Sequence, residues 1–286
     1  HPGTTINYHF AKAINVKTSQ TVKFVDDQGN QFKNHKPNTQ DGYSFTIKDG
    51  KPTEESHTYN DVDVPVIPGY VADKTSLIKD KDGKYVPGPN IIVDKDGGTY
   101  VPGQKVTVDN PNVTIEVVYH KVGKIVPVDK DGNEIPNAPT PAYKNDPTDP
   151  TKVTPDESTP SIPGYHITGN ENPGKNPDGT PNNNTVTPQK PTMDTRVVYT
   201  KQGSITVKYH DTTDNVDIPG YGTTDQGNEN DPFTYDPTSD LTDLKGKGYV
   251  VDGEVPKIPN KFSDIPQTFV INVKHGTITV TPDKPG

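Results

Sequence analysis

Three segments of the sequence end in the same way, and this recurrence limits what the chain can fold into. Each ends in a run of β-branched residues, then a short polar break with a glycine, then another β-branched run. The breaks fall at Gly123, Gly203 and Gly276. Such runs on both sides of a break are typical of consecutive strands. The pattern predicts small β-rich modules in which the last strand of one leads into the first strand of the next.

A second landmark recurs inside the predicted modules. Ile-Pro-Gly-Tyr ends at Tyr70 and again at Tyr165, and Gly-Tyr at Tyr249 is a looser third copy. Pro-Gly favours a turn, and the tyrosine that follows can begin a strand with its ring on the core. We therefore expect these three tyrosines to be core anchors.

The composition sets the size of the cores. Of 286 residues only 27% are hydrophobic, while 31 are proline and 25 are glycine. One large core is therefore disfavoured, and several thin ones fit better. We expect an elongated monomer of three modules at residues 1–121, 122–201 and 202–286. The absence of cysteine excludes disulfides, thiolate zinc sites and a cysteine nucleophile. Lysine–asparagine isopeptide bonds stay open.

The charge and hydropathy of the chain limit the kinds of partner that it can bind. The net charge is −9 and lysine and arginine form no cluster. This balance disfavours nucleic acid and anionic membranes as partners. No segment approaches the ~18 apolar residues of a membrane span. No signal peptide or anchor signal is expected in this chain.

Local patterns predict a mainly β fold with one short helix. The helix is expected at residues 237–246, with a serine or threonine cap, and residues 169–184 are expected to form a long exposed loop. The order of elements in the third module is compatible with a β-grasp arrangement, and we expect the same in the first. The strands are expected at residues 5–10, 21–25, 43–48, 70–72, 105–108, 113–119, 205–209, 233–235, 249–251 and 268–273.

Two stretches of the first module carry a resemblance to a known family. Thr-Ile-Asn-Tyr-His-Phe at residues 5–10, with residues 20–24, resembles the opening of the Mub-type mucus-binding repeat of lactobacilli. Val-Ile-Pro-Gly-Tyr-Val-Ala-Asp-Lys at residues 66–74 resembles its central signature. The module departs from the usual pattern between Leu77 and Gln104, where it carries extra residues.

The other two modules resemble companions of that repeat. Residues 123–153, with Ile-Pro-Gly-Tyr-His at 162–166, resemble the Mub B2-like domain. The third module is similar to the mucin-binding MucBP-like module at Tyr-His-Asp (209–211), Ile-Pro-Gly-Tyr (218–221) and Val-Lys-His-Gly-Thr (273–277). The resemblance implies a cell-wall-attached extracellular adhesin that binds mucus glycoproteins. For some relatives it also implies immunoglobulin binding. It transfers no binding residue.

One loop has part of the residue spacing of a calcium-binding loop. Asp129, Asp131 and Asn133 occupy the first, third and fifth positions of an EF-hand-like loop. The sixth position should be glycine but is Glu134, and the twelfth should be an acid but is Thr140. Asp-Gly is also a strong turn signal in its own right. We favour a turn over a calcium site, and we expect no other cofactor.

Ligand binding, where it occurs, is expected to use exposed aromatic faces, on which sugar rings can stack. Tyr85 and Tyr100, in the extra segment of the first module, are the candidates for glycan contact. No pattern of nucleophile, base or phosphate loop is present, so an enzyme is not expected. Two other functions stay open. One is a ligand-free stalk, and the other is an immunoglobulin-binding module that uses a β edge.

Overall fold

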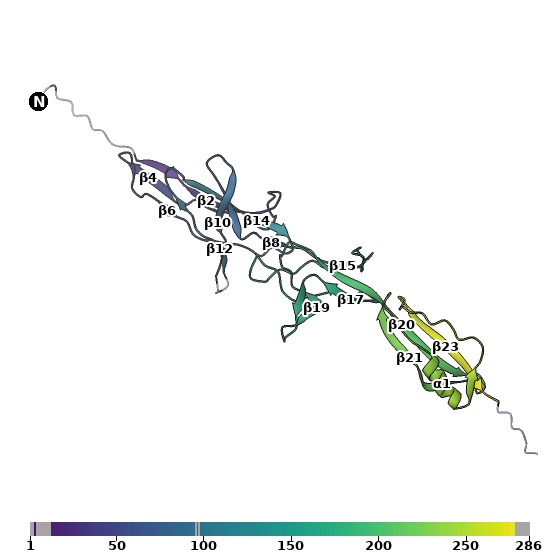
Figure 1. The fold of residues 1–286 in the computed structure, drawn as a ribbon. Helices are drawn as coiled ribbons and strands as arrows, with labels where there is room; N and C mark the ends of the chain where they lie inside the picture. The colour runs from purple at the N-terminus through teal and green to yellow at the C-terminus, as the bar shows by residue number, and fades with distance from the viewer. Residues whose placement is uncertain (1–2, 4–12, 95, 97, 278–286) are drawn as a thin grey trace, which may run out of the picture. The chain divides into compact units, whose positions relative to one another are not determined.

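The computed structural model describes residue 3, residues 13–94, residue 96 and residues 98–277. Its described part is built mainly of short β-sheets with one helix, which confirms the expected fold class (Figure 1). The chain divides into two compact units. Unit 1 extends to Val126 and includes Thr140–Thr159 and Glu171–Thr195, and unit 2 includes Pro127–Pro139, Pro160–Asn170 and the chain from Arg196 onward. The strand expected at residues 5–10 lies outside the described residues.

Unit 1 is organised by a parallel pair of strands. β2 (Ser19–Asp26) and β14 (Asn112–Lys121) run parallel at the centre of a sheet of order β10-β9-β14-β2-β3. Their residues alternate between buried and half-buried positions, because successive side chains of a strand point to opposite faces. The other strands of this sheet are β3 (Asn38–Gln40), β8 (Tyr70–Ala72), β9 (Thr75–Lys79) and β10 (Tyr85–Asn90).

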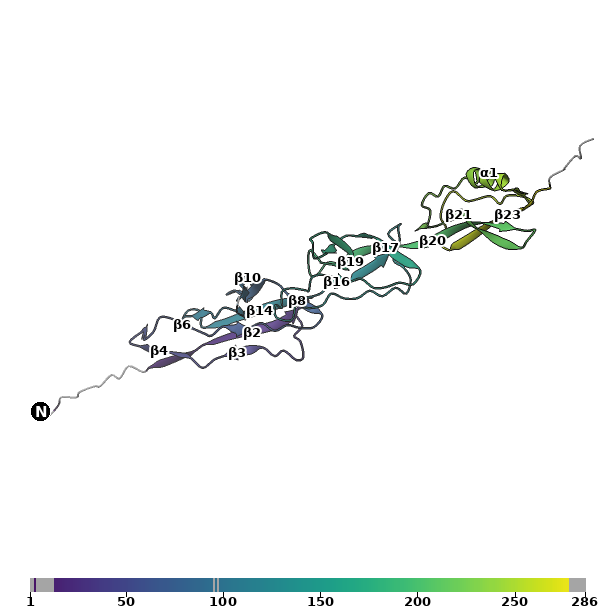
Figure 2. The same ribbon diagram turned by 90° about the horizontal axis from the view of Figure 1, so that it is seen from below.

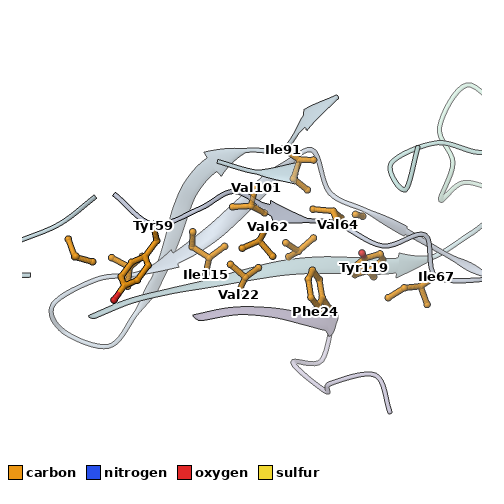
Figure 3. Packing of buried hydrophobic residues seen from close by; sticks show 14 of the residues in the cluster. Val22, Phe24, Tyr59, Val62, Val64, Ile67, Ile91, Val101, Ile115 and Tyr119 are labelled. Carbon is orange, nitrogen blue, oxygen red and sulfur yellow. The ribbon is translucent and has the colours of Figure 1, made fainter. Parts of the chain in front are cut away.

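The inward faces of this pair form one layer of the core. Val22 and Phe24 from β2 lie beside Ile115 and Tyr119 from β14, and Val62 and other valines cover them (Figure 3). Small sheets supply the cover. Their strands are β1 (Ile14–Lys17), β4 (Ser44–Lys48), β5 (Lys51–Pro52), β6 (His57–Thr58), β7 (Val62–Asp63), β11 (Ile92–Val93), β12 (Thr99–Val101) and β13 (Lys105–Val106). A separate three-stranded sheet contains β16 (Glu157–Ser158), β18 (Pro173–Lys175) and β19 (Pro181–Val186).

Unit 2 repeats the parallel pair. β20 (Thr195–Asp211) runs parallel to β23 (Pro266–His275) and antiparallel to β21 (Val216–Asn228), while β22 (Tyr249–Val251) joins the far side of β23. β17 (Tyr165–Asn170) also pairs with β20. β15 (Ile125–Val128) lies at the boundary of the two units.

A single helix packs on the sheet of unit 2. α1 (Thr238–Gly246) lies against this sheet and buries Leu244 (Figure 2). The predicted serine or threonine cap is wrong. The N-cap is Pro237, which has no side chain that can accept a hydrogen bond. Instead, the carboxylate of Asp236 accepts the N–H of Thr238 at 3.0 Å.

The three Gly-Tyr strands hold the same place in the fold. Tyr70 pairs with Lys121, Tyr165 with Lys201 and Tyr249 with His275, so each tyrosine begins a short strand that runs antiparallel to a long one. The three tyrosines are half-buried. Tyr70 packs edge-on against Phe32, and Tyr249 packs against the core of unit 2. Their recurrence therefore reflects a shared structural position.

The fully buried tyrosines lie instead on the long strands. Tyr119 and Tyr199 are 0% and 2% exposed. The Tyr119 hydroxyl donates to the carbonyl of Pro65 at 2.6 Å, and that of Tyr199 to Pro160 at 2.5 Å. Each proline lies five residues before the tyrosine of its Gly-Tyr strand, so the same hydrogen bond ties each approach segment to its long strand. Burial raises the pKa of Tyr119 well above its usual range.

Three local predictions are wrong. The break expected at Gly203 does not exist, because β20 continues through it. Gly203 is needed there because a Cβ would lie 2.2 Å from the carbonyl oxygen of Ser263. Residues 169–184 contain β18 and the start of β19. This segment has few apolar residues, but the two strands pair and so satisfy the hydrogen-bonding groups of its backbone. The strand expected at residues 233–235 is irregular chain, with one bridge at Pro232.

We expect Tyr119→Phe to lower the free energy of unfolding by about 1–2 kcal/mol, because the Pro65 carbonyl loses its partner. The urea midpoint should fall with little change in slope. Tyr100→Phe is the control, since the described contacts include no hydrogen bond to the Tyr100 hydroxyl. Equal midpoints for the two variants would show that the Pro65 contact contributes nothing.

Candidate functional site

The predicted calcium residues form a turn whose main oxygen is already occupied. Oδ1 of Asp129 accepts the backbone N–H groups of Asp131 at 2.9 Å and Asn133 at 3.0 Å. Asp131 and Asn133 themselves are exposed. The structure brings the three residues together, but it directs the Asp129 carboxylate to its own turn. The preference for a turn over a calcium site stays a prediction.

The same turn recurs in unit 1. Oδ1 of Asp26 accepts the N–H groups of Gln28 and Asn30, and Oδ1 of Asp80 accepts those of Asp82 and Lys84. An aspartate that bonds its own backbone two residues on is a common way to close a turn. The repeated geometry accounts for the Asp-rich loops without a ligand.

The two predicted glycan tyrosines lie in different sheets. Tyr85 begins β10, and the Lys79 ammonium lies 6.0 Å from its ring centroid. Burial and the carboxylate of Glu116 raise the pKa of Tyr85. Tyr100 lies in β12 and pairs with Ile92 and Asp63. Both rings are half-buried, so each offers only part of a face.

A better aromatic platform lies elsewhere in unit 1. The rings of Tyr43 and His57 stack with centroids 4.0 Å apart and planes 6° from parallel. They line an open hollow together with Gln40, Tyr59 and Asn60. The Tyr43 hydroxyl donates to Glu54 at 2.6 Å, and this bond raises the pKa of Tyr43. The hollow combines flat faces with amides, which suits a sugar.

Unit 2 carries a polar surface between β21 and α1. The Tyr221 hydroxyl donates to the Asp243 carboxylate, and the Lys247 ammonium donates to the Tyr221 oxygen at 2.7 Å. The same ammonium lies 5.2 Å from the ring centroid of Tyr221. Lys247, Asp243 and Thr242 also line an open hollow along the helix. These groups offer a ring, a cation and oxygen acceptors on one surface.

Electrostatics keep this surface in one protonation state. The hydrogen bond from Tyr221 and the charge of Lys247 hold the pKa of Asp243 below its usual value. The Tyr221 hydroxyl and the Asp243 carboxylate raise the pKa of Lys247. Lys247 and Asp243 are therefore both charged at neutral pH, and their pairing favours a polar, hydrogen-bonding ligand.

The buried Tyr209 and the half-buried Tyr235 support this surface. Tyr209 and Tyr235 share a hydrogen bond at 2.7 Å, and Tyr235 donates to Asp240 at 2.6 Å. The other contact of Asp240 is the N–H of Gly222, beside Tyr221, at 2.9 Å. Burial and the Asp240 contact raise the pKa of Tyr235. The network fixes the segment that carries Tyr221 against the helix.

A third cluster closes the far end of the unit 2 sheet. Asp211, Asp214 and His275 have ligand atoms within 4.8 Å of one another, a spacing that could hold a cation. Nε2 of His275 lies 2.8 Å from Asp211 and 3.3 Å from Asp214. Oδ1 of Asp211 accepts the N–H of Thr213, so both oxygens of this carboxylate already have a protein partner. The cluster ties the turn after β20 to the end of β23.

The segment that carries these last two sites has a known relative. Residues 203–275 match the family model of the mucin binding domain. The match confirms the resemblance of this segment to a MucBP-type repeat. Domains of this type are binding domains of extracellular surface proteins and not an enzyme family. The matched residues include Tyr221, Asp243 and Lys247 and make up less than half of the chain.

The chain as a whole has no strong relative among curated proteins or in the solved structure compared with it. No curated protein matches the sequence. The solved structure of "The Bacillus anthracis TIE protein" is 11% identical over 90% of this chain and 51% of that one, with a TM-score of 0.22. A likeness at that score carries no argument about fold or function. No helix in the described residues is long and apolar enough to cross a membrane.

The sequence analysis predicted neither the Tyr43–His57 hollow nor the surface formed by Tyr221, Asp243 and Lys247. Tyr43 and His57 are far apart in sequence, and their stacking depends on how small sheets pack. Tyr221 and Lys247 meet only because α1 lies across β21. The Ile-Pro-Gly-Tyr motif that ends at Tyr221 was a visible signal, because the resemblance to the MucBP-like module rests partly on it.

We expect added calcium to leave the melting temperature unchanged within about 1 °C, because the Asp129 carboxylate is used by its own turn. A ligand that binds only the folded state must raise that temperature. Thermal melts with calcium and with a chelator measure the effect, and magnesium is the matched control. A steep rise specific to calcium, lost in Asp129→Asn, would establish the site.

The buried Asp211 predicts acid sensitivity in unit 2. Burial opposes its ionisation, but the hydrogen bonds from His275 and the amides of Asp214 and Thr213 outweigh this and hold its pKa below the ordinary 3.8. A lowered carboxyl pKa stabilises the fold above the unfolded value, and this contribution is lost as pH falls through the folded value. We expect the melting temperature to drop below pH 3.8.

Asp211→Asn should be less stable at neutral pH, and its melting temperature should change less below pH 3.8 than that of the parent. The matched control is Asp225→Asn, which removes an exposed carboxylate. Circular dichroism melts between neutral pH and pH ~2 compare them. An acid loss in Asp211→Asn as steep as in the parent would assign the sensitivity to another carboxylate.

Proposed function

We propose that this chain is a non-enzymatic segment of a cell-wall-attached bacterial adhesin that binds mucin glycans non-covalently. The observation that carries the proposal is the match of residues 203–275 to the mucin binding domain. The surface formed by Tyr221, Asp243 and Lys247 is our preferred contact, because it lies inside the matched segment and combines a ring face with charged hydrogen-bonding groups. The Tyr43–His57 hollow is a second contact of similar chemistry.

The division into three modules and the β-grasp assignment belong to the same proposal. In support, the order β21-β20-β23-β22, with a central parallel pair and a helix before β22, suits a β-grasp arrangement in the third module. The order β3-β2-β14-β9 in unit 1 resembles it without a helix. We also propose that the chain is a monomer.

A glycan array compared with an immunoglobulin pull-down tests the class of ligand. Mucin-type glycans should be retained and immunoglobulin should not. Retention of immunoglobulin alone would replace this function with a protein-binding one. Retention of neither, in single and in bead-displayed form, would leave the chain as a spacer.

We expect binding by a single chain to be weak and to gain strength through display. The surfaces are open, so each buries little of a sugar. Tandem or bead-bound copies on immobilised mucin turn later contacts into intramolecular ones and should raise retention about 10²–10⁴-fold. Nanomolar binding of one chain in solution would contradict this.

Side-chain variants locate the contact in the bead assay. Lys247→Ala should reduce retention about tenfold, the effect of losing a contact worth ~1.4 kcal/mol. Lys261→Ala removes an exposed charge from the same unit and should have no effect. Tyr85→Ala and Tyr100→Ala test the earlier candidates. A loss in either of these with no loss in Lys247→Ala would move the site to the first module.

A further inference from the structure

The Gly-Tyr strands β8 and β22 have matching inner edges. The N–H of Asp73 donates to Val118 and that of Asp252 to Asn272, both at 2.8 Å. The residue after each long strand donates to the glycine before the tyrosine: Val122 to Gly69, and Gly276 to Gly248. Val251 therefore occupies the position that Ala72 occupies in unit 1.

The outer edge of β8 is covered by a loop. The N–H of Ala72 donates to the carbonyl of Pro150 at 2.8 Å. The Asn145 side-chain amide donates to the carbonyls of Tyr70 at 2.7 Å and Ile67 at 3.1 Å. Its oxygen accepts the N–H of Gly69 at 2.9 Å. One asparagine and one proline carbonyl thus satisfy the backbone of a strand edge.

The loop is shaped for this contact. It reads Asn-Asp-Pro-Thr-Asp-Pro-Thr over residues 145–151. Oδ1 of Asp146 accepts the N–H groups of Thr148 and Asp149, and Asp149 in turn holds Thr151. These bonds fix the loop internally, so it binds the edge with little loss of conformational freedom.

The outer edge of β22 is open. Val250 and Val251 are 42% and 37% exposed, whereas the matching Val71 and Ala72 are 3% and 5% exposed. In an antiparallel pair successive N–H groups alternate in direction. Because the N–H of Asp252 points inward to Asn272, that of Val251 points to the open side. A hollow lined by Leu241, Tyr249 and both valines lies beside it.

We propose that the open edge of β22 is a docking site for a second loop of the 145–151 kind, carried by a further module of the second type placed after His275. The proline carbonyl would accept the Val251 N–H, and the asparagine amide would donate to the Tyr249 carbonyl. The proline rings would cover Val250 and Val251. The Gly248 N–H already donates to Lys245 at the end of α1, so the contact has one bond fewer than in unit 1.

The test joins residues 1–275 directly to a second copy of residues 122–286, because His275 matches Lys121 in register. Glu254→Asp in the added copy changes the mass of its peptides, so hydrogen exchange by mass spectrometry reads both β22 edges in one molecule. Only the first β22 is followed by the loop. We expect its Val251 amide to exchange at least about tenfold more slowly than that of the added copy.

Two variants of the added copy sharpen the result. Asn145→Ala should remove the difference, and Asn176→Ala, an asparagine in another loop of the same module, should preserve it. Equal exchange at the two edges would overturn the proposal. Protection of both edges that rises with protein concentration would also overturn it and assign the edge to a second molecule.

Discussion

The parallel pairing of a first and a last long strand is the constraint on which the rest of the structure depends. In unit 1, β2 ends at Asp26 and pairs with β14, which begins at Asn112, and in unit 2, β20 likewise pairs with the distant β23. A parallel pair cannot be closed by a tight turn, so a long connection must leave the sheet and return. That connection supplies the cover of the core: small sheets in unit 1, and a helix with a loop in unit 2.

Thin cores make tyrosine hydroxyls important. Few apolar residues are available, and Tyr119, Tyr199 and Tyr209 are among the largest buried side chains. A buried ring adds apolar area, and its hydroxyl must find a partner, because an unpaired buried polar group is costly. Here the partner is the proline carbonyl before a Gly-Tyr strand, or a second tyrosine. The same side chain therefore fills the core and fixes the path of a proline-rich segment.

The sequence foretold the elements that depend on local pattern. The long strands around Val117 and Ile205, the short strands at Tyr70 and Tyr249, and the helix at Leu244 all form where periodicity and turn residues indicate. The sequence did not predict features that depend on the close approach of two backbone segments or on contacts between distant residues. Gly203 permits a continuous strand beside the Ser263 carbonyl, which no local pattern reveals. The candidate surface was missed for the same reason, since Tyr221 and Lys247 meet only across a helix and a strand.

Polar loops in this chain have two roles that look alike in sequence. At Asp129 the carboxylate is turned inward on its own backbone, so the loop is complete in itself. At residues 145–151 the aspartates do the same work, which frees Asn145 and the Pro150 carbonyl to bond another strand. An Asp-Pro-rich loop can thus seal a β edge without apolar residues. The contact consists of hydrogen bonds to the strand backbone, whose geometry depends on register more than on the side chains of the strand.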